Sequence, residues 1–436
     1  MFSRRSFIKS SIVAGAPFVL PTRIWAADVK PNQRMGMGFV GVGKMGNGLL
    51  KHFLHQDEVR VLAVCDVDTT RRDAARQKVD THYENKDCKS YSDFCELTSR
   101  PDIDLICIAT PDHWHAAICI DALKNGKDVY CEKPLTHNVH EAIELMKAVD
   151  KYGRVLQTGS MQRSSKEFRI ACELVLNGVI GKVSHVDCSF GDPGIPYDLQ
   201  QQNMEPGLDW NQWCGPAPLV AYNSALSPRG LHNHFPQWRK YREFGGGMVT
   251  DWGAHHLDIA QWGLGRDASG PVEVRPPAQS DAQRGARLIY DDGIYVEHVN
   301  GFGVHFFGSE GEVMVNRGKF ALKKDGEFFA KFTKREDGSS CAAQVKKAED
   351  AFLKQAEVKL YNSSSHIKDF LSCVRTRKKP ITNEIVGGRS AICCHLMNQA
   401  YYNHAKILWD PQNLKLQPGG GNPEWLTRNY RAPWCV

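Results

Sequence analysis

The feature that most constrains this chain is a glycine-rich turn between an apolar run and a helix-like segment. Residues 35–40 (MGMGFV) read as a short buried strand, and residues 41–46 (GVGKMG) follow it at once. In such a turn Gly41 permits a tight bend, Gly43 lets the backbone approach a pyrophosphate, and Gly46 lets the helix pack closely on the strand. Because the N–H groups at a helix N-terminus favour phosphate, the turn predicts the start of a dinucleotide-binding domain.

Three further apolar runs continue the alternation of strand and helix. Residues 59–65, 104–109 and 127–131 read as strands, and helix-like segments separate them. Alternation of this kind with short connections is typical of a parallel, doubly wound sheet. We therefore predict an N-terminal Rossmann domain at residues 35–158.

An acidic residue at the end of the second strand bears on the choice of cofactor. Asp66 lies 20 residues after Gly46, where a carboxylate suits the ribose hydroxyls of NAD. Arg71 and Arg72 follow, and they could instead meet the 2′-phosphate of NADP. Charged neighbours on a helix are more often a solvated face. The sequence therefore favours NAD, with NADP as the alternative.

Two polar motifs follow the later strands of this sheet. Residues 110–115 (TPDHWH) come after the third strand, and residues 132–134 (EKP) come after the fourth. Open parallel sheets bind their ligands at the carboxyl ends of the strands. We therefore expect both motifs at the same edge of the sheet as the glycine turn.

The second half of the chain contains a run of ionisable residues behind a glycine turn. Asp251, His255 and Asp258 follow residues 245–247 (GGG), and on a helix these three side chains share one face. A single helical histidine is more often structural, but three ionisable groups on one stripe favour a functional site. His256 adjoins His255, and two histidines with a carboxylate could bind a metal. Adjacent helical positions diverge by about 100°, so we expect no resident metal.

An irregular segment precedes this run. Residues 191–233 are rich in glycine, proline and aromatic residues, including Trp210, Trp213 and Tyr222. Aromatic faces with hydrogen-bonding rims suit the apolar faces and hydroxyls of a sugar. The same composition also fits a long insertion that packs on itself, and the residues alone leave both interpretations open.

These motifs resemble those of the Gfo/Idh/MocA oxidoreductase family, which includes glucose–fructose oxidoreductase and inositol dehydrogenase. The turn at 41–46 is shared with many families, and EKP at 132–134 is the more specific signal. The D-x-x-x-H pattern of Asp251 and His255 looks like a second signature of the same family. The resemblance implies an α/β fold, in which the Rossmann domain with its doubly wound parallel sheet is followed by a C-terminal α+β domain at 159–409. That second domain would hold a large, open, mainly antiparallel sheet.

The resemblance also implies roles for individual residues. It places Lys133, Asp251 and His255 around the reacting hydroxyl as catalytic residues. The predicted cofactor-binding residues are Gly41, Gly43, Lys44, Met45, Gly46, Asp66, Thr110, Pro111, His115, Glu132, Lys133 and Gln162. The predicted substrate-binding residues are Lys133, Arg163, Arg239, Asp251, His255 and His256. A homodimer or homotetramer would form through the C-terminal sheet. The chain ends in a tail at 410–436, of which Trp425–Trp434 could be an arm that reaches a neighbouring subunit.

These residue types suit the oxidation of a secondary alcohol, in which a base removes the O–H proton while hydride leaves to a nicotinamide. A histidine such as His255, with an ordinary pKa of about 6.5, can take that proton near neutral pH. Lys133 can stabilise the developing alkoxide, or act as the base if it is desolvated. Asp251 or Asp258 can orient the imidazole.

The N-terminus resembles an export signal. Arg4 and Arg5 precede an apolar run of ten residues at 11–20, which is too short to span a bilayer because a spanning helix needs about 20 residues. The pattern is typical of a Tat signal, predicted at 1–27, and we expect no membrane anchor after its removal. The prediction is a periplasmic or otherwise exported protein, and a cytoplasmic protein with a basic start is the alternative.

The charge of the chain argues against a nucleic-acid partner. The formal net charge is +6, and the four basic residues of segment 1–27 account for four of these charges, which leaves +2. A body so close to neutral does not attract nucleic acid through bulk charge. A small carbohydrate is the expected partner.

The sequence therefore predicts an NAD(P)-dependent oxidoreductase that moves hydride between a tightly bound nicotinamide cofactor and a secondary hydroxyl of a sugar, glycoside or polyol. Free dinucleotide is not expected outside the cytoplasm, so an exported enzyme would keep its cofactor through turnover. One alternative is an NAD-dependent glycosidase that acts by transient oxidation and elimination. Another is a non-catalytic protein that binds sugar or dinucleotide.

Overall fold

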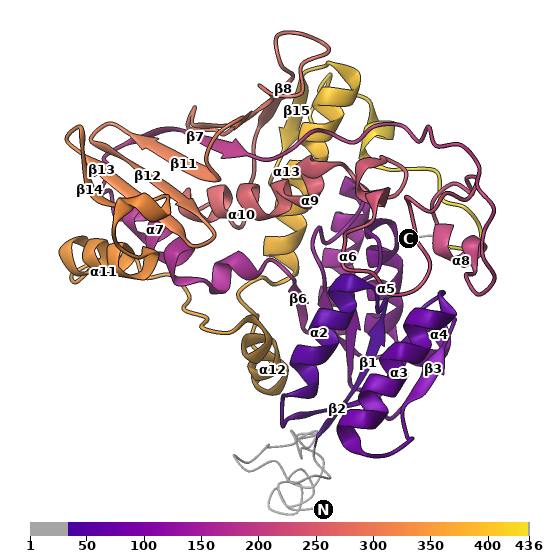
Figure 1. Cartoon of the computed structure of the whole chain (residues 1–436). Coiled ribbons are helices and arrows are strands. Elements are labelled where there is room, and N and C mark those ends of the chain that lie inside the picture. The colour runs from indigo at the N-terminus through magenta and orange to yellow at the C-terminus, as the bar shows by residue number, and fades with distance from the viewer. Residues whose placement is uncertain (1–33, 435–436) are drawn as a thin grey trace, which may run out of the picture. The chain divides into compact units, whose positions relative to one another are not determined.

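The computed structural model describes residues 34–434 of the chain (Figure 1). The predicted export signal at 1–27 falls outside the described residues. Within residues 34–434, no helix is both long enough and apolar enough to cross a membrane.

The first half of the chain forms a parallel sheet of six strands in the order β3-β2-β1-β4-β5-β6. Its strands are β1 (Met35–Val40), β2 (Val59–Cys65), β3 (Lys89–Tyr91), β4 (Leu105–Ile108), β5 (Asp128–Cys131) and β6 (Leu156–Thr158). The helices between them are α2 (Lys44–Leu54), α3 (Thr69–Tyr83), α4 (Phe94–Thr98), the short η2 (Asp112–Trp114), α5 (His115–Lys124) and α6 (Val139–Tyr152).

Helices cover both faces of this sheet, which confirms the doubly wound prediction (Figure 1). Met37 and Phe39 of β1 belong to a core that includes Phe53 of α2. Val40 of the same strand belongs to a second core with Ile118 of α5. A strand buried on both faces needs apolar side chains at nearly every position, which explains the continuous apolar runs in the sequence.

The register of the strands brings their carboxyl ends to one edge. Val40, the last residue of β1, pairs with Cys65 at the end of β2 and with Ile108 at the end of β4. Ile108 in turn pairs with Cys131 at the end of β5. The glycine turn, Asp66 and the two polar motifs all follow these aligned ends, as the sequence predicts.

The N-terminal domain is completed by a helix from far along the chain. Helix α12 (His366–Thr376) packs against it, with the ring of Phe370 centred 6.4 Å from that of Phe53 and 5.8 Å from that of Tyr130. This helix lies beside α2 (Figure 1). The predicted span 35–158 therefore contains the whole sheet but not all of the helices that cover it.

The second half builds a sheet of ten strands in the order β14-β13-β12-β11-β7-β10-β9-β8-β15-β16. Only the pair β7–β10 is parallel among the described strands of this sheet. The strands are β7 (Val183–Ser189), β8 (Glu273–Arg275), β9 (Arg287–Ile289), β10 (Tyr295–Val299), β11 (Val304–Gly308), β12 (Gly311–Asn316), β13 (Lys319–Lys324), β14 (Glu327–Phe332), β15 (Ile407–Asp410) and β16 (Lys415–Leu416). The large, mainly antiparallel sheet is thus confirmed.

Helices of the second half pack against this sheet around one large apolar core. Phe168 of α7, Ile259 of α10 and Ile392 of α13 meet Val186 and Phe306 of the sheet there. The helices and short helical turns are η3 (Met161–Ser164), α7 (Lys166–Leu176), α8 (Trp210–Cys214), η4 (Gln237–Lys240), α9 (Met248–Asp251), α10 (Gly253–Gly263), η5 (Arg335–Asp337), α11 (Cys341–Phe352), α13 (Glu384–Asn403) and η6 (Pro423–Leu426).

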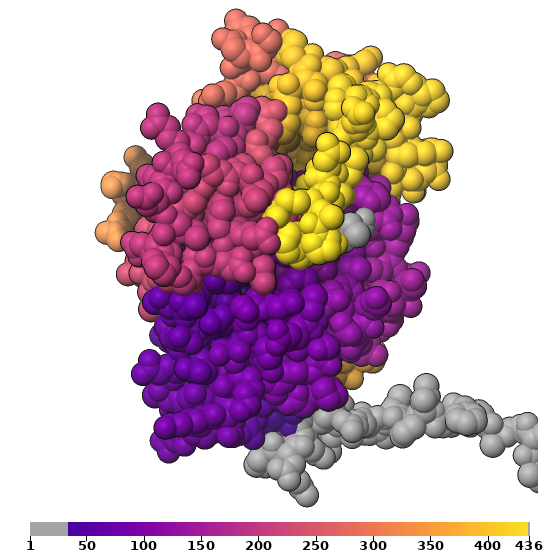
Figure 2. Space-filling model, turned by 90° about the vertical axis from the view of Figure 1, so that its right-hand side faces the viewer, coloured from indigo at the N-terminus to yellow at the C-terminus, as the bar shows by residue number. Residues whose placement is uncertain are grey.

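The C-terminal tail folds back onto its own chain. Strand β16 pairs with β15, and the residues after η6 run down to the N-terminal domain, where Arg428 contacts Glu141. In the space-filling view the tail lies between the segment that precedes α9 and the N-terminal domain (Figure 2). The described part of the tail, up to Trp434, thus packs on its own chain, and the arm that reaches a neighbouring subunit stays a prediction.

Candidate active site

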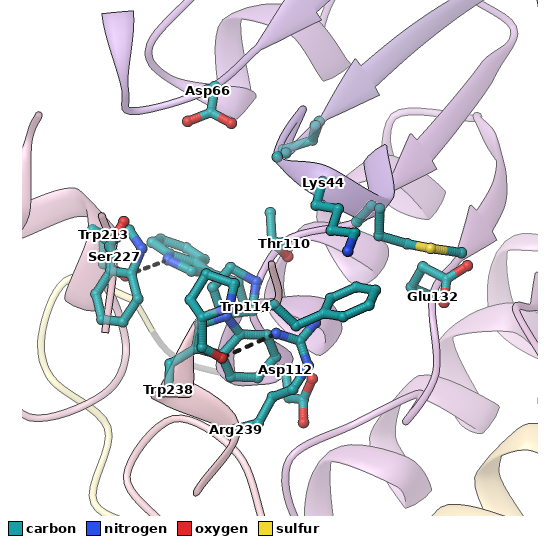
Figure 3. Close-up of a pocket in the computed structure, with 18 of the residues that line it drawn as sticks. Lys44, Asp66, Thr110, Asp112, Trp114, Glu132, Trp213, Ser227, Trp238 and Arg239 are labelled. Carbon is teal, nitrogen blue, oxygen red and sulfur yellow. Dashed lines mark hydrogen bonds between the residues drawn. The ribbon is translucent and has the colours of Figure 1, made fainter. Parts of the chain in front are cut away.

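A cavity of about 690 Å³ lies at the carboxyl edge of the parallel sheet and extends to residues of the second domain. Twelve of the predicted site residues line it: Gly41, Gly43, Lys44, Met45, Asp66, Thr110, Pro111, Glu132, Lys133, Arg239, Asp251 and His255. Figure 3 shows several of these side chains around the hollow, with Asp66 at one end and Asp112 and Arg239 at the other. The predicted residues Gly46, His115, Gln162, Arg163 and His256 are not part of the lining.

The glycine turn has the shape that a pyrophosphate requires. Gly41 has a φ of +81°, and a Cβ there would lie 2.7 Å from the backbone nitrogen of Thr110. A Cβ at Gly46 would lie 2.0 Å from the carbonyl oxygen of Gly41, so Gly46 serves close packing and not the cavity. A Cβ at Gly43 would meet nothing within 4 Å, because this residue faces open space.

The N-terminus of α2 is free to bind an anion. Its N-cap residue is Gly43, no side chain caps it, and no acidic residue lies in the first turn. The first N–H groups of a helix have no partner within the helix and carry partial positive charge. With the open space at Gly43, this arrangement fits the phosphates of a dinucleotide.

Asp66 is held in place by backbone amides. Its Oδ2 accepts a hydrogen bond from Val42 N at 2.9 Å, and its Oδ1 accepts one from Asp68 N at 2.9 Å. Burial raises the pKa of Asp66, although the nearby Arg71 and these amides oppose that shift. The carboxyl is thus tied to the glycine turn and lies in the cavity wall.

Arg71 is not on a solvated helix face, and that interpretation is corrected. The side chain is buried, its Nε donates to the carbonyl of Gly230 at 3.0 Å, and another guanidinium nitrogen donates to the carbonyl of Pro228. Arg71 therefore anchors the end of the irregular segment 191–233. Local charge patterning missed this contact because its partners lie more than 150 residues away in sequence.

Lys133 and Asp251 form an ion pair that joins the two domains. Lys133 follows β5, and Asp251 ends the short helix α9. Besides the ion pair, Lys133 Nζ donates to the backbone carbonyl of Asp251 at 2.9 Å, and Arg239 Nε lies 3.6 Å from Asp251 Oδ1. Burial alone would raise the pKa of Asp251, but the charges of Lys133 and Arg239 lower it, so the carboxyl stays ionised.

His255 lies in the wall of the same cavity. It is 5% exposed, and its Nδ1 has no hydrogen-bond partner among the described residues. Burial, and then the positive charge of Lys133, hold the pKa of His255 well below its ordinary value. The imidazole is therefore neutral near pH 7.

The predicted stripe of Asp251, His255 and Asp258 is only partly correct. Asp251 ends α9, His255 and Asp258 belong to α10, and Trp252 separates the two helices. Neither carboxylate orients the imidazole: Asp251 pairs with Lys133, and Asp258 is fully buried and bonded to Arg163. The proposed orienting role of these two residues is therefore corrected.

Arg163 belongs to a buried ion-pair network. Its Nε donates to Asp258 Oδ2 at 2.8 Å, and its Nη1 donates to Asp267 Oδ2 at 2.8 Å. The guanidinium also lies over Trp262, 4.9 Å from the ring centroid. With its side chain 1% exposed, Arg163 has a structural role in place of the predicted substrate contact.

The other predicted residues outside the lining support nearby loops or face elsewhere. His115 lies within hydrogen-bond distance of two carbonyls, with Nδ1 2.7 Å from Pro134 O and Nε2 3.0 Å from Thr110 O, so it ties the EKP loop to the preceding motif. Gln162 is buried, and neither amide atom has a partner among the described residues. His256 directs Nδ1 to Ser189 O at 2.7 Å, away from the cavity lined by His255.

Two buried acids accompany the ion pair in the cavity wall. Burial raises the pKa of Glu132 to about 7, although Lys133 opposes the shift. Burial also raises the pKa of Asp112 well above its ordinary value. Glu132 would thus be largely protonated at mildly acidic pH, while Asp251 stays charged.

Several lining residues were not predicted from the sequence. They include Trp114, Phe235, Trp238, Arg317 and Trp434.

The aromatic content of the irregular segment indicated only some of the aromatic lining residues. Trp213 lines the cavity, whereas Trp210 stacks behind it with ring centroids 4.5 Å apart. Both interpretations of that segment therefore hold in part, since it packs on itself and also presents aromatic faces to the cavity. Arg317 comes from the turn between β12 and β13, and no motif marks it.

The metal alternative does not match the arrangement of ligands. Across residues 34–434, no three side chains of His, Cys, Asp or Glu gather closely enough to hold a metal ion. His255 and His256 lie on different sides of α10, as the helical angle between neighbours predicts.

One cavity thus combines the edge of a Rossmann sheet, a free helix N-terminus lined by glycine, and a lysine–carboxylate pair. This combination defines an NAD-binding oxidoreductase fold. Residues 35–160 match the family model described as "Oxidoreductase family, NAD-binding Rossmann fold". Residues 173–334 match its companion, "Oxidoreductase family, C-terminal alpha/beta domain". The chain belongs to the Gfo/Idh/MocA oxidoreductase family, which confirms the resemblance drawn from the motifs.

The chain is also similar to curated relatives and to solved structures. A "Glycosyl hydrolase family 109 protein" of Shewanella pealeana is 29% identical over 41% of this chain and 38% of its own length. A protein of the same description from Saccharopolyspora erythraea is 31% identical over 49% of this chain and 50% of its own length. The chain thus spans half or less of these relatives. The WlbA dehydrogenase of Bordetella pertussis, solved with NADH and UDP-GlcNAcA, has a TM-score of 0.58 at 17% identity, covering 87% of this chain and 98% of that one.

Proposed function

We propose that this protein is an NAD-dependent oxidoreductase that removes hydride from a secondary hydroxyl of a sugar, glycoside or related polyol. One observation carries the proposal: Lys133, Asp251 and His255 line the same cavity as the glycine turn. A dinucleotide whose phosphates lie at α2 would extend along the carboxyl edge of the sheet. Its nicotinamide end would then come near Lys133.

The roles of the side chains follow from their charges. When bound, the nicotinamide ring supplies the hydride acceptor. The ammonium of Lys133, held by Asp251, donates a hydrogen bond to the substrate oxygen and stabilises the negative charge that develops there. The neutral imidazole of His255 is in the form that accepts the hydroxyl proton. The C–H and O–H bonds of the alcohol break, and a carbonyl forms.

The part of the cavity that would hold the adenosine of the cofactor favours NAD over NADP. The carboxyl of Asp66 lies in the cavity wall, where it suits two ribose hydroxyls and would repel a 2′-phosphate. The arginine best placed to receive that phosphate, Arg71, already bonds the carbonyls of Pro228 and Gly230.

A second candidate function is supported by the names of the relatives. Both relatives described above are glycosyl hydrolase family 109 proteins. A glycosidase on this fold would begin with the same oxidation. The new carbonyl then acidifies a neighbouring C–H, loss of that proton expels the glycosidic oxygen, and the hydride returns after water adds. Such an enzyme cleaves a glycoside without net reduction of its cofactor.

A single assay separates these functions. Purified full chain is incubated with NAD and a panel of p-nitrophenyl glycosides and free sugars, while nitrophenol release and reduced-nicotinamide absorbance are both followed. A dehydrogenase reduces its NAD as it oxidises substrate, and a cofactor that stays bound gives up to one equivalent of NADH per active site. Nitrophenol release without NADH supports the glycosidase. Binding of sugar or dinucleotide without either signal, unchanged in a Lys133→Met variant, would leave the non-catalytic binding protein as the remaining interpretation.

We further propose export by the Tat route with the cofactor already bound, and assembly as a homodimer or homotetramer through the C-terminal sheet. Folding in the cytoplasm before export would allow cofactor loading there. Cell fractionation of the full chain and of an Arg4→Lys, Arg5→Lys variant tests the first proposal, and light scattering of the purified protein tests the second.

A further inference from the structure

The last described residues of the chain return to the cavity. After η6 the tail leaves the second domain, and Pro433 and Trp434 enter the lining. Figure 2 shows this tail in yellow against the N-terminal domain. Because Pro433 and Trp434 lie so far along the chain from the glycine turn, no sequence motif indicates that they share a cavity with it.

Buried contacts hold the tail on the N-terminal domain. Arg428 Nη2 donates to Glu141 Oε1 at 2.7 Å and to the carbonyl of His113 at 2.7 Å. The Glu141 side chain is fully buried, and the hydroxyl of Tyr430 donates to it at 3.1 Å. A buried charge that is paired and hydrogen-bonded in this way fixes its neighbours, because an unpaired carboxylate there would be costly.

A second anchor places the end of the tail beside the cavity. Arg431 Nε donates to Gly215 O at 2.9 Å, and its Nη2 donates to Asn211 O at 2.6 Å. The guanidinium also lies over the ring of Trp434, 4.7 Å from its centroid. Trp434 N donates to Arg431 O at 3.1 Å, which closes a turn that directs the indole to the cavity.

Trp434 completes a row of aromatic rings. Its ring centroid lies 5.7 Å from that of Trp114, and the ring of Trp114 lies 5.5 Å from that of Phe94. All three residues line the cavity, together with Ser92 and Asp93. Phe94 begins α4, directly after the loop that follows β3.

The position of this row identifies the part of the cofactor that it would meet. Asp66 is placed for the adenosine ribose, and its backbone N–H donates to Tyr91 O at 3.2 Å, so the ends of β2 and β3 lie together. The base attached to that ribose would lie beyond Asp66, on the side of β3 and away from Lys133. Phe94 follows β3, its ring packs on that of Trp114, and the indole of Trp434 adds a ring from the tail.

We propose that Trp434 forms a wall of the adenine subsite, so that the C-terminal tail supplies a cofactor-binding residue to the Rossmann domain. Stacking or edge contact between an aromatic ring and a base contributes affinity without a requirement for a particular base. The anchored tail would therefore strengthen binding of an adenine dinucleotide and slow its release. This inference rests on the proposed NAD-binding function and extends it to a residue outside the Rossmann domain.

The experiment compares three ligands that differ in which half of the cofactor they carry. NADH contains both halves, ADP only the adenosine half, and reduced nicotinamide mononucleotide only the other half. Dissociation constants are measured by calorimetry on the purified full chain after copurified dinucleotide has been removed. Trp434→Ala is expected to weaken NADH and ADP by about tenfold, since aromatic–base contacts are worth roughly that factor or more, and to leave reduced nicotinamide mononucleotide within about twofold. Trp434→Phe should retain most of the affinity.

A second tryptophan of the same tail provides a matched control. Trp425 packs beside the core of the second domain and does not line the cavity. Trp425→Ala is expected to leave all three dissociation constants unchanged. Equal losses for NADH and for reduced nicotinamide mononucleotide in Trp434→Ala, or unchanged ADP affinity, would overturn the adenine assignment. Failure of the parent protein to bind either NADH or ADP would instead overturn the proposed function, and the inference with it.

Discussion

At the residue scale, the ion pair between Lys133 and Asp251 places a fixed positive charge in the cavity, where the proposed reaction would form an alkoxide. Lys133 comes from the Rossmann domain and Asp251 from the second domain, so the reacting centre exists only when both are folded together. The charge is preorganised, because the carboxylate and the backbone carbonyl of Asp251 already hold the ammonium before substrate binds.

Replacing Lys133 by methionine should therefore remove catalysis and spare cofactor binding. We expect kcat to fall by about a thousandfold, as is typical when a positioned charge or proton-transfer group is lost. The dissociation constant for NADH should change by less than about threefold. Steady-state kinetics and NADH fluorescence titration measure the two effects. The exposed Lys151, replaced in the same way, is the control and should behave as the parent.

Arg163 was predicted to bind substrate, but its buried ion pairs mean that its replacement should lower stability and not substrate binding. Arg163→Met leaves Asp258 buried without its cation, and breaking a buried pair typically costs about 3–5 kcal/mol. Urea unfolding should show a loss of that order, with KM for substrate unchanged in the folded variant. A stable variant with a raised KM would show that Arg163 contacts substrate after all.

The local sequence could predict that Asp251 and His255 share a site, since they are close along the chain. It could not predict that Asp258 leaves this site, because Arg163 is 95 residues away. Nor could it predict that Trp252 interrupts the helix or that Arg71 turns inward to the irregular segment. Asp258 and Arg71 each bind a partner that lies far away in the sequence, and no periodic pattern connects a residue to such a partner.

At the element scale, the glycine turn before α2 has two roles, phosphate binding and close packing, and different glycines carry them. Gly43 faces open space, whereas a side chain at Gly46 would meet the carbonyl oxygen of Gly41. Gly43→Val should lower NADH affinity by more than about tenfold with little loss of thermal stability, because only the cradle is filled. Gly46→Ala should lower the free energy of unfolding by about 1–3 kcal/mol through overpacking.

Thermal melts and NADH titration of both variants check this contrast. If Gly43→Val bound NADH as well as the parent, the phosphate cradle would have to lie elsewhere.

The elements of the parallel sheet could be predicted because each strand is a continuous apolar run followed by a polar motif. Helix α12 could not be assigned to that domain, since an amphipathic helix does not reveal which core it will join. The segment 191–233 lacks periodicity, so its path depends on contacts such as those of Arg71.

At the scale of the whole molecule, buried imidazoles should set the acid stability. Among the described residues, burial lowers the pKa of five histidines to about 4: His115, His256, His298, His366 and His395. In the unfolded chain a histidine titrates at about 6.5. Unfolding between these values takes up protons, so the stabilisation is present above pH 6.5 and is lost as pH falls towards 4.

The free energy of unfolding, measured with urea at pH 7.5 and at pH 5, should therefore be lower at pH 5 by several kcal/mol. Glu132 acts in the opposite direction, because its raised pKa of about 7 gives stability that is lost as pH rises from about 4.5 through 7. One carboxyl cannot offset five imidazoles. Equal stability at the two pH values would mean that these histidines are hydrated or charged in the folded protein.

The central claim is that a nicotinamide ring lies between the phosphate cradle at Gly43 and the pair of Lys133 and His255. A crystal structure of the purified full chain with NADH tests it most directly. The account predicts the pyrophosphate at the N-terminus of α2, with nicotinamide C4 facing a space that one alcohol carbon can fill. A hydroxyl on that carbon should reach Lys133 Nζ and the His255 ring at about 3 Å each. A nicotinamide bound away from Lys133, or a cavity that excludes the dinucleotide, would contradict it.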